Sequence, residues 1–110
     1  MAKAGFINGK HYTFYVDTVK QLKRDGKLDE AEKLLLKLID AVEEESRQEG
    51  VLVAPWYYEQ LAILYRKQKL YEKEVSILTR FVAQRHEKGH PLEERLTKAR
   101  LATAKVEMEK

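Results

Sequence analysis

The spacing of the apolar residues is the feature of this sequence that most narrows its fold. In five successive segments these residues recur at intervals of three and four, which gives an α-helix one apolar face. No segment shows the alternation of apolar and polar residues that is typical of a half-buried strand. The sequence therefore predicts an all-α domain over 11–108, with helical segments at approximately 11–25, 29–50, 55–68, 71–89 and 92–106.

The breaks between these segments contain residues that end or begin helices. Gly26 follows the first segment, where a left-handed cap favours a residue without Cβ, and Gly50 closes the second. Asp29 is suited to cap the start of the second helix, and Pro55 to occupy the first position of the third. Such short connections predict antiparallel helical hairpins, with the third helix central and the more polar fifth at the edge.

Composition limits the classes of protein to which this chain can belong. Of its 110 residues, 44% are hydrophobic and 35% are charged, so it can bury one core but not two independent ones. There is no cysteine, which excludes disulfides and thiolate metal sites. Residues 1–10 contain Gly5, Asn8 and Gly9 and lack a long apolar stretch. We therefore expect an irregular arm there, no signal peptide, no membrane span and a cytoplasmic location.

The first two segments resemble the third and fourth. The same order of residue types occurs in residues 20–31 and 61–74. In each, an apolar helix end is followed by two basic residues, a polar turn, one apolar residue and the acidic start of the next helix. Similarity at a period of tens of residues predicts stacked helical hairpins.

This pattern resembles the tetratricopeptide repeat. In the second unit, the positions that pack that family's two helices are matched by Tyr58, Leu61, Ala62, Tyr65, Tyr71, Leu78 and Phe81. In the first unit the corresponding places are filled by Tyr15, Leu22, Gly26, Leu28, Ala31, Leu35 and Leu38. The resemblance covers roughly residues 11–88, and it implies two divergent repeats followed by a C-terminal capping helix.

The chain also departs from the family pattern. Leu22 and Tyr65 hold equivalent places but lie 43 residues apart, against about 34 in the family. Glu74 falls where the family has a small alanine, unless a register shift places Val75 there, and Val19 replaces a small residue in the first unit. Because repeat arrays usually need three or more units, either the fifth helix covers the open edge or the chain self-associates. A homodimer is the expected state in the second case.

One motif suggests a metal site. The run His86-Glu87-Lys88-Gly89-His90 matches H-E-x-x-H, in which two histidines on one helical face bind zinc and the glutamate acts as general base. Here Gly89 and Pro91 flank the second histidine, so we expect the helix to stop before His90 reaches that face. A third ligand would have to be His11. A zinc-dependent hydrolase using His86, Glu87 and His90 is therefore a remote alternative, and we predict no catalytic residue, metal or cofactor.

The basic residues give a stronger functional indication. In the tetratricopeptide family the first helices of successive repeats line a concave face. The resemblance places on that face Thr13, Val16, Lys20, Lys23 and Arg24 from the first helix, and Trp56, Glu59, Ile63, Arg66 and Lys67 from the third. Two groups of cations around a small apolar strip suit an acidic peptide or a C-terminal carboxylate, because ammonium and guanidinium groups form charge-assisted hydrogen bonds with carboxylates. The alternative is that these are ordinary solvated side chains.

The aromatic run Trp56-Tyr57-Tyr58 must spread around its helix, since consecutive residues lie about 100° apart. We expect Tyr58 in the core and Trp56 on the partner surface. The sequence thus predicts a non-catalytic protein–protein interaction module that binds a short peptide segment, either acidic or not, or a partner domain in its concave groove. The alternative is a nucleic-acid-associated accessory protein that uses a basic face; the net charge of +3 is compatible with either.

Overall fold

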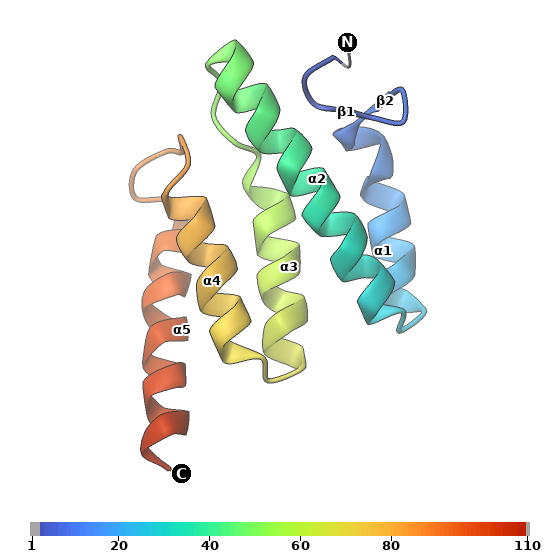
Figure 1. The fold of residues 1–110 in the computed structure, drawn as a ribbon. Coiled ribbons are helices and arrows are strands. Elements are labelled where there is room, and N and C mark those ends of the chain that lie inside the picture. The colour runs from blue at the N-terminus through green and yellow to red at the C-terminus, as the bar shows by residue number, and fades with distance from the viewer. Residues whose placement is uncertain (1–2, 110) are drawn as a thin grey trace.

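The computed structural model describes residues 3–109 and contains, within that range, a short β-hairpin followed by five α-helices (Figure 1). The hairpin pairs β1 (Phe6–Ile7) with β2 (Lys10–His11), and a 3₁₀ turn, η1 (Tyr12–Tyr15), follows it. The helices are α1 (Val16–Arg24), α2 (Leu28–Glu49), α3 (Pro55–Lys67), α4 (Tyr71–Val82) and α5 (Pro91–Met108). The predicted all-α class with about five helices is confirmed.

Each helix runs antiparallel to the one before it, so that the chain zigzags across the molecule (Figure 1). The most extensive contacts are those of α3 with α4, α4 with α5 and α2 with α3. As expected, α3 lies between two neighbours and α5 lies at the edge against α4. No helix in the described part of the chain is both long enough and apolar enough to cross a membrane.

The core is one cluster of buried side chains to which all five helices contribute. Every helix buries one apolar face there, as the spacing of three and four residues requires. The fully buried members include Val19, Leu35, Leu38, Tyr58, Leu61, Leu78, Phe81 and Ala99. The prediction that Tyr58 lies in the core is correct.

The two hairpin turns are equivalent, and they lie 43 residues apart as the sequence suggests. Gly26 and Lys69 both adopt left-handed φ angles, of 71° and 59°. In the first turn the Lys27 N–H donates to the Leu22 carbonyl, and in the second the Leu70 N–H donates to the Tyr65 carbonyl, each at 2.9 Å. One turn further on, Ala31 and Glu74 are both fully buried. Glu74 therefore occupies the alanine place, without a shift of register to Val75.

The N-terminal arm is more ordered than the sequence indicates. Asn8 and Gly9 have φ angles of 50° and 79° and form the turn of the β-hairpin, which these two residue types favour. His11 Nε2 lies 2.7 Å from Glu45 Oε2, and the Tyr12 hydroxyl donates to Glu45 Oε1 at 2.8 Å. The expected irregular arm is thus in part a hairpin attached to α2; its residues 1 and 2 lie outside the described residues.

Several helix ends differ from the expected ones. The first helical segment opens with the 3₁₀ turn η1. Asp29 lies inside the first turn of α2, whose N-cap is Lys27, so the Asp29 cap was predicted wrongly; its carboxylate still lies near the positive end of the helix dipole. The helix α4 ends at Val82 and not near Gly89. The residues after it form a loop, in which the Arg85 carbonyl accepts the Val53 N–H at 2.9 Å and the Arg85 guanidinium donates to the Gly50 carbonyl at 2.9 Å.

Candidate functional site

The topology brings the basic ends of α1 and α3 to the same end of the molecule (Figure 1). The last turn of α1 carries Lys23 and Arg24, and that of α3 carries Arg66 and Lys67. Cations are favourable at these places because the C-terminus of a helix carries the negative end of its dipole. Local preference and tertiary arrangement together concentrate positive charge there.

A first hollow of about 400 Å³ opens between α1 and α3, and we call it the α1–α3 hollow. From α1 it is lined by three residues that are neighbours on one helical face, and from α3 by two residues seven apart, which share a face. The lining side chains are those of Lys20, Lys23, Arg24, Gln60 and Lys67. The Lys23 ammonium donates to Gln60 Oε1 at 2.6 Å and so joins the two helices.

The cations of the α1–α3 hollow have no carboxylate in direct contact within the described chain. Partial burial and, next, the nearby cation of Lys67 lower the pKa of Lys23, and Glu59 acts in the opposite direction. Among residues 3–109, none of the four cations of this hollow forms an ion pair with a carboxylate. By contrast, Arg80 pairs with both Asp40 and Glu43. The hollow is therefore a place where an anion would find several free donors.

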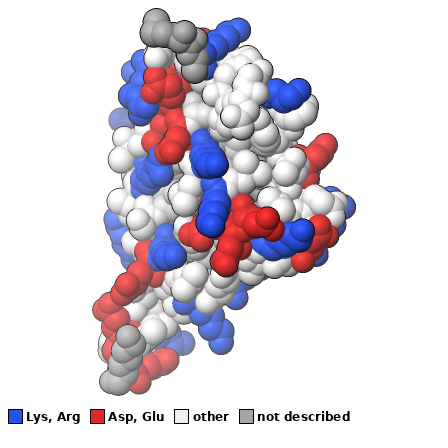
Figure 2. Space-filling view, turned by 45° about the vertical axis from the view of Figure 1, so that its right-hand side comes forward, with Lys and Arg blue, Asp and Glu red and all other residues white. Residues whose placement is uncertain are grey.

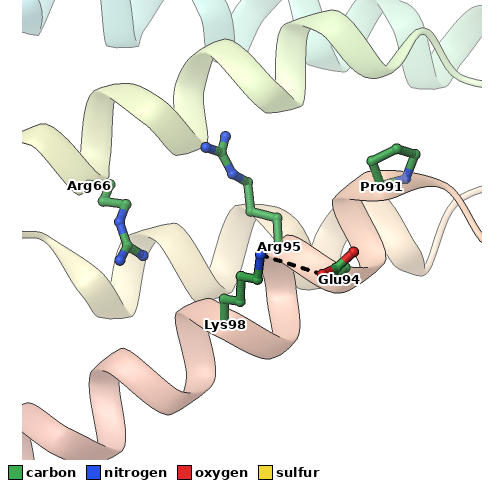
Figure 3. A pocket seen from close by; sticks show the side chains of 5 residues that line it. All are labelled: Arg66, Pro91, Glu94, Arg95 and Lys98. Carbon is green, nitrogen blue, oxygen red and sulfur yellow. Dashed lines mark ion pairs between the residues drawn. The ribbon is translucent and has the colours of Figure 1, made fainter.

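A second hollow, of about 410 Å³, lies between α3 and α5, and we call it the α3–α5 hollow (Figure 3). It is lined by Arg66, Pro91, Glu94, Arg95 and Lys98. In Figure 3 the side chain of Arg95 extends from α5 toward α3, while the Lys98 ammonium lies 3.4 Å from the Glu94 carboxylate. The second hollow is thus also rich in cations, with one acidic side chain at its rim.

Arg66 also contacts a buried acid. Its Nη1 lies 3.4 Å from Glu74 Oε1, and Glu74 is fully buried. The other carboxylate oxygen of Glu74 has no hydrogen-bond donor within the described structure. The contact is long and uses one nitrogen of a guanidinium with five N–H donors, so Arg66 retains donors for the hollow.

The structure brings only some of the predicted site residues together. Lys20, Lys23, Arg24 and Lys67 line the α1–α3 hollow, whereas Arg66 lines the α3–α5 hollow. Glu59 and Ile63 are half-buried on α3 and line neither hollow. Trp56 is half-buried at the start of α3, and its ring packs edge-on against Tyr57 with the centroids 5.0 Å apart. Trp56 lines neither hollow, although it precedes Gln60 by four residues and so lies on the same side of α3.

Sequence reasoning missed Gln60, Arg95 and Lys98. Gln60 carries no charge and was therefore overlooked. It precedes Lys67 by seven residues, so both lie on one face of the helix, and this spacing could have indicated that Gln60 lines the same hollow. The basic residues of α5 lie on the helix that the sequence predicts to be a cap, and no local pattern shows that they lie beside Arg66.

The H-E-x-x-H run lacks the geometry that zinc binding requires. His86 lies in the loop after α4, with Nε2 2.7 Å from Glu93 Oε2 and Nδ1 2.8 Å from the Gln84 carbonyl oxygen. His90 caps α5, where its Nδ1 accepts the Leu92 N–H at 3.1 Å. The two histidines are therefore not on one face of a continuous helix. Within residues 3–109, no group of three or more His, Asp or Glu side chains is placed to hold a metal ion.

No family model, no curated protein and no solved structure matches this chain. The charge distribution over the surface is mixed: on the face drawn in Figure 2, Lys and Arg side chains are interspersed with Asp and Glu side chains. The groups of cations at the two hollows are therefore local features on a surface of mixed charge.

Proposed function

We propose that this protein is a non-catalytic interaction module of tetratricopeptide type, and that its α1–α3 hollow binds an acidic segment of a partner protein. The equivalent turns and the equivalent buried positions of the two hairpins support the assignment to a helical repeat. The repeat of 43 residues is longer than the usual one of about 34, because α2 has 22 residues and a connector follows it.

The observation that carries this proposal is the set of four unpaired cations around one hollow. Partial burial and, next, the nearby charge of Lys67 add to the cost of keeping Lys23 charged. A carboxylate placed between them would offset both effects and accept charge-assisted hydrogen bonds. Binding would therefore raise the pKa of Lys23.

A peptide fits these observations better than a nucleic acid. A nucleic acid presents a phosphate at every nucleotide and favours an extended basic surface. Here the two hollows each gather only a few cations, and the face in Figure 2 carries both signs of charge.

The proposal is tested with a fluorescently labelled peptide of alternating Asp and Glu, whose binding is followed by fluorescence anisotropy. We expect Lys23→Gln combined with Lys67→Gln to weaken binding by about tenfold, the equivalent of about 1.4 kcal/mol. The matched control is Lys33→Gln with Lys37→Gln, which removes the same charge from exposed positions of α2. If both pairs of substitutions weaken binding equally, only net charge is involved and the site is wrong.

A second arm separates the peptide from nucleic acid. The same titrations use a labelled single-stranded oligonucleotide, over a range of salt concentrations. Binding through several phosphates weakens steeply as salt rises. Tighter binding of the oligonucleotide than of the peptide, with such a slope, would replace the proposed function by the accessory role in nucleic-acid binding.

A further inference from the structure

The last turn of α3 separates the two hollows. Arg66 and Lys67 are consecutive, so their side chains leave the helix about 100° apart. Lys67 lines the α1–α3 hollow and Arg66 lines the α3–α5 hollow. A ligand that enters both hollows must therefore cross α3 at this turn.

An apolar side chain occupies the crossing point. Ile63 precedes Arg66 by three residues and Lys67 by four, and on a helix residues at these spacings are surface neighbours. With about 100° per residue, Ile63 lies on the arc of α3 between the two basic side chains. Ile63 is half-buried, so part of its side chain remains available for contact. The surface thus runs from a basic hollow over an apolar ridge to a second basic hollow.

The α3–α5 hollow has its own donors for an anion. Within the described residues, Arg95 forms no ion pair, and Arg66 uses one nitrogen in its 3.4 Å contact with Glu74. Lys98 is paired only with Glu94, and both side chains are largely exposed to solvent. Such an exposed pair holds its partners weakly, so a ligand carboxylate can compete for Lys98.

We propose that the α3–α5 hollow is a second anion subsite, and that the partner segment is bipartite, with two acidic groups flanking an apolar residue. One acidic group binds in the α1–α3 hollow, the apolar side chain lies on Ile63, and the second acidic group binds Arg66, Arg95 and Lys98. This inference rests on the proposed function and adds to it the pattern of the ligand.

Three peptides test the pattern by isothermal titration: Asp-Asp-Gly-Leu-Gly-Asp-Asp, the same peptide with Gly in place of Leu, and the same peptide with Asn-Asn as its second pair. We expect the first to bind wild type about tenfold more tightly than the third and about threefold more tightly than the second. In Arg95→Gln combined with Lys98→Gln, the first peptide should bind as weakly as the third. The control Lys33→Gln with Lys37→Gln should leave these ratios unchanged.

A substitution that strengthens binding cannot be explained by misfolding of the variant, because a misfolded variant would bind more weakly. Glu94→Gln removes the acid at the rim of the α3–α5 hollow and frees Lys98, so the first peptide should bind about threefold more tightly. The third peptide, which lacks the second acidic pair, should not respond.

The outcomes separate this inference from the proposed function. If no peptide binds wild type, the proposed function fails and the inference with it. If all three bind wild type with equal affinity and binding still depends on Lys23 and Lys67, the proposed function stands. The bipartite pattern and the second subsite are then wrong. A response of the third peptide to Glu94→Gln equal to that of the first would also overturn the second subsite.

Discussion

Arg80 and Glu43 join α4 to α2 through a network of charged side chains. Arg80 Nε donates to Glu43 Oε2 at 2.7 Å, and Arg80 Nη2 donates to Asp40 at 2.7 Å and to Glu43 Oε1 at 2.9 Å. The Tyr58 hydroxyl donates to the same Glu43 carboxylate at 2.7 Å. These hydrogen bonds to Glu43, more than any other effect, raise the pKa of Arg80, while burial is the main cause of the raised pKa of Tyr58. Glu43 is only 7% exposed and therefore depends on these partners.

Removing Arg80 leaves a buried carboxylate with one neutral donor. We expect Arg80→Ala to lower the free energy of unfolding by about 3 kcal/mol, because breaking a buried pair leaves its partner uncompensated. Urea denaturation measures the loss. Arg47→Ala is the control, since Arg47 pairs with Glu44 on an exposed surface and should lose much less stability. Similar losses in the two variants would show that the network contributes nothing beyond a surface pair.

Among the elements, the two hairpin turns provide an internal comparison. Gly26 and Lys69 occupy equivalent left-handed positions, but only glycine adopts such a φ angle without cost. A Cβ at Gly26 would meet no atom within 4 Å, so Gly26→Ala tests the backbone angle alone.

We expect Gly26→Ala to lower the free energy of unfolding by about 1 kcal/mol and Lys69→Gly to raise it by up to about 1 kcal/mol. Thermal or urea unfolding of the two variants beside wild type checks both signs. If the two substitutions shift stability in the same direction, the turns are not equivalent in the way that their geometry indicates.

The loop between α4 and α5 is held by a histidine. Both ring nitrogens of His86 face oxygen acceptors, the Gln84 carbonyl and the Glu93 carboxylate, at 2.8 and 2.7 Å. Only the doubly protonated ring donates to both. The bond to Gln84 and then the bond to Glu93 accordingly raise the pKa of His86 above its usual 6.5, against the opposing effect of burial.

Because the folded state binds this proton more tightly than the unfolded state, the His86 contribution to stability is complete below pH 6.5. It is lost as the pH rises through the raised pKa. We expect the urea midpoint of wild type to fall between about pH 6 and pH 8, and that of His86→Gln to fall less. A fall of the same size in both proteins would assign the pH dependence to another group.

The elements could be predicted from the sequence more completely than the site. Pro55 at the first position of α3 and Gly50 at the end of α2 act through their own backbone angles, and both were predicted correctly. The early end of α4 could not be predicted, because the loop that replaces its last turns is held by the distant Val53 and Gly50. The four cations of the α1–α3 hollow were among those predicted, but Arg66 lies in the other hollow.

At the scale of the whole molecule, the helices form a flat array measuring 50 × 34 × 20 Å. The edge helix α5 packs against α4 with one face and exposes Leu101 and Met108 on another, at 67% and 87%. These two residues lie seven apart and therefore on one side of the helix. The edge of the array thus offers an apolar strip to a second copy of the chain.

We expect the chain to form a homodimer through this strip, because α5 covers the edge of α4 but leaves these two large apolar side chains exposed to solvent. Light scattering over a range of concentrations measures the mass. Leu101→Gln combined with Met108→Gln should shift the equilibrium toward monomer. A wild-type mass that stays monomeric at the highest concentration would contradict the expectation and leave α5 as a simple cap.

The sequence by itself determined the five helical segments, the helix ends at Gly26 and Gly50, and the 43-residue spacing of the two turns. The helical segments and their ends depend on residues within about one helical turn of one another, whereas the 43-residue spacing follows from comparing the two turns along the chain. Only the tertiary structure decided which cations meet. The bond between Lys23 and Gln60 spans 37 positions, and the contact of Arg66 with α5 depends on how α3, α4 and α5 pack. These contacts depend on how the side chains of different helices pack against one another. Neither the composition of the chain nor the periodicity of its apolar residues shows directly which residues come into contact.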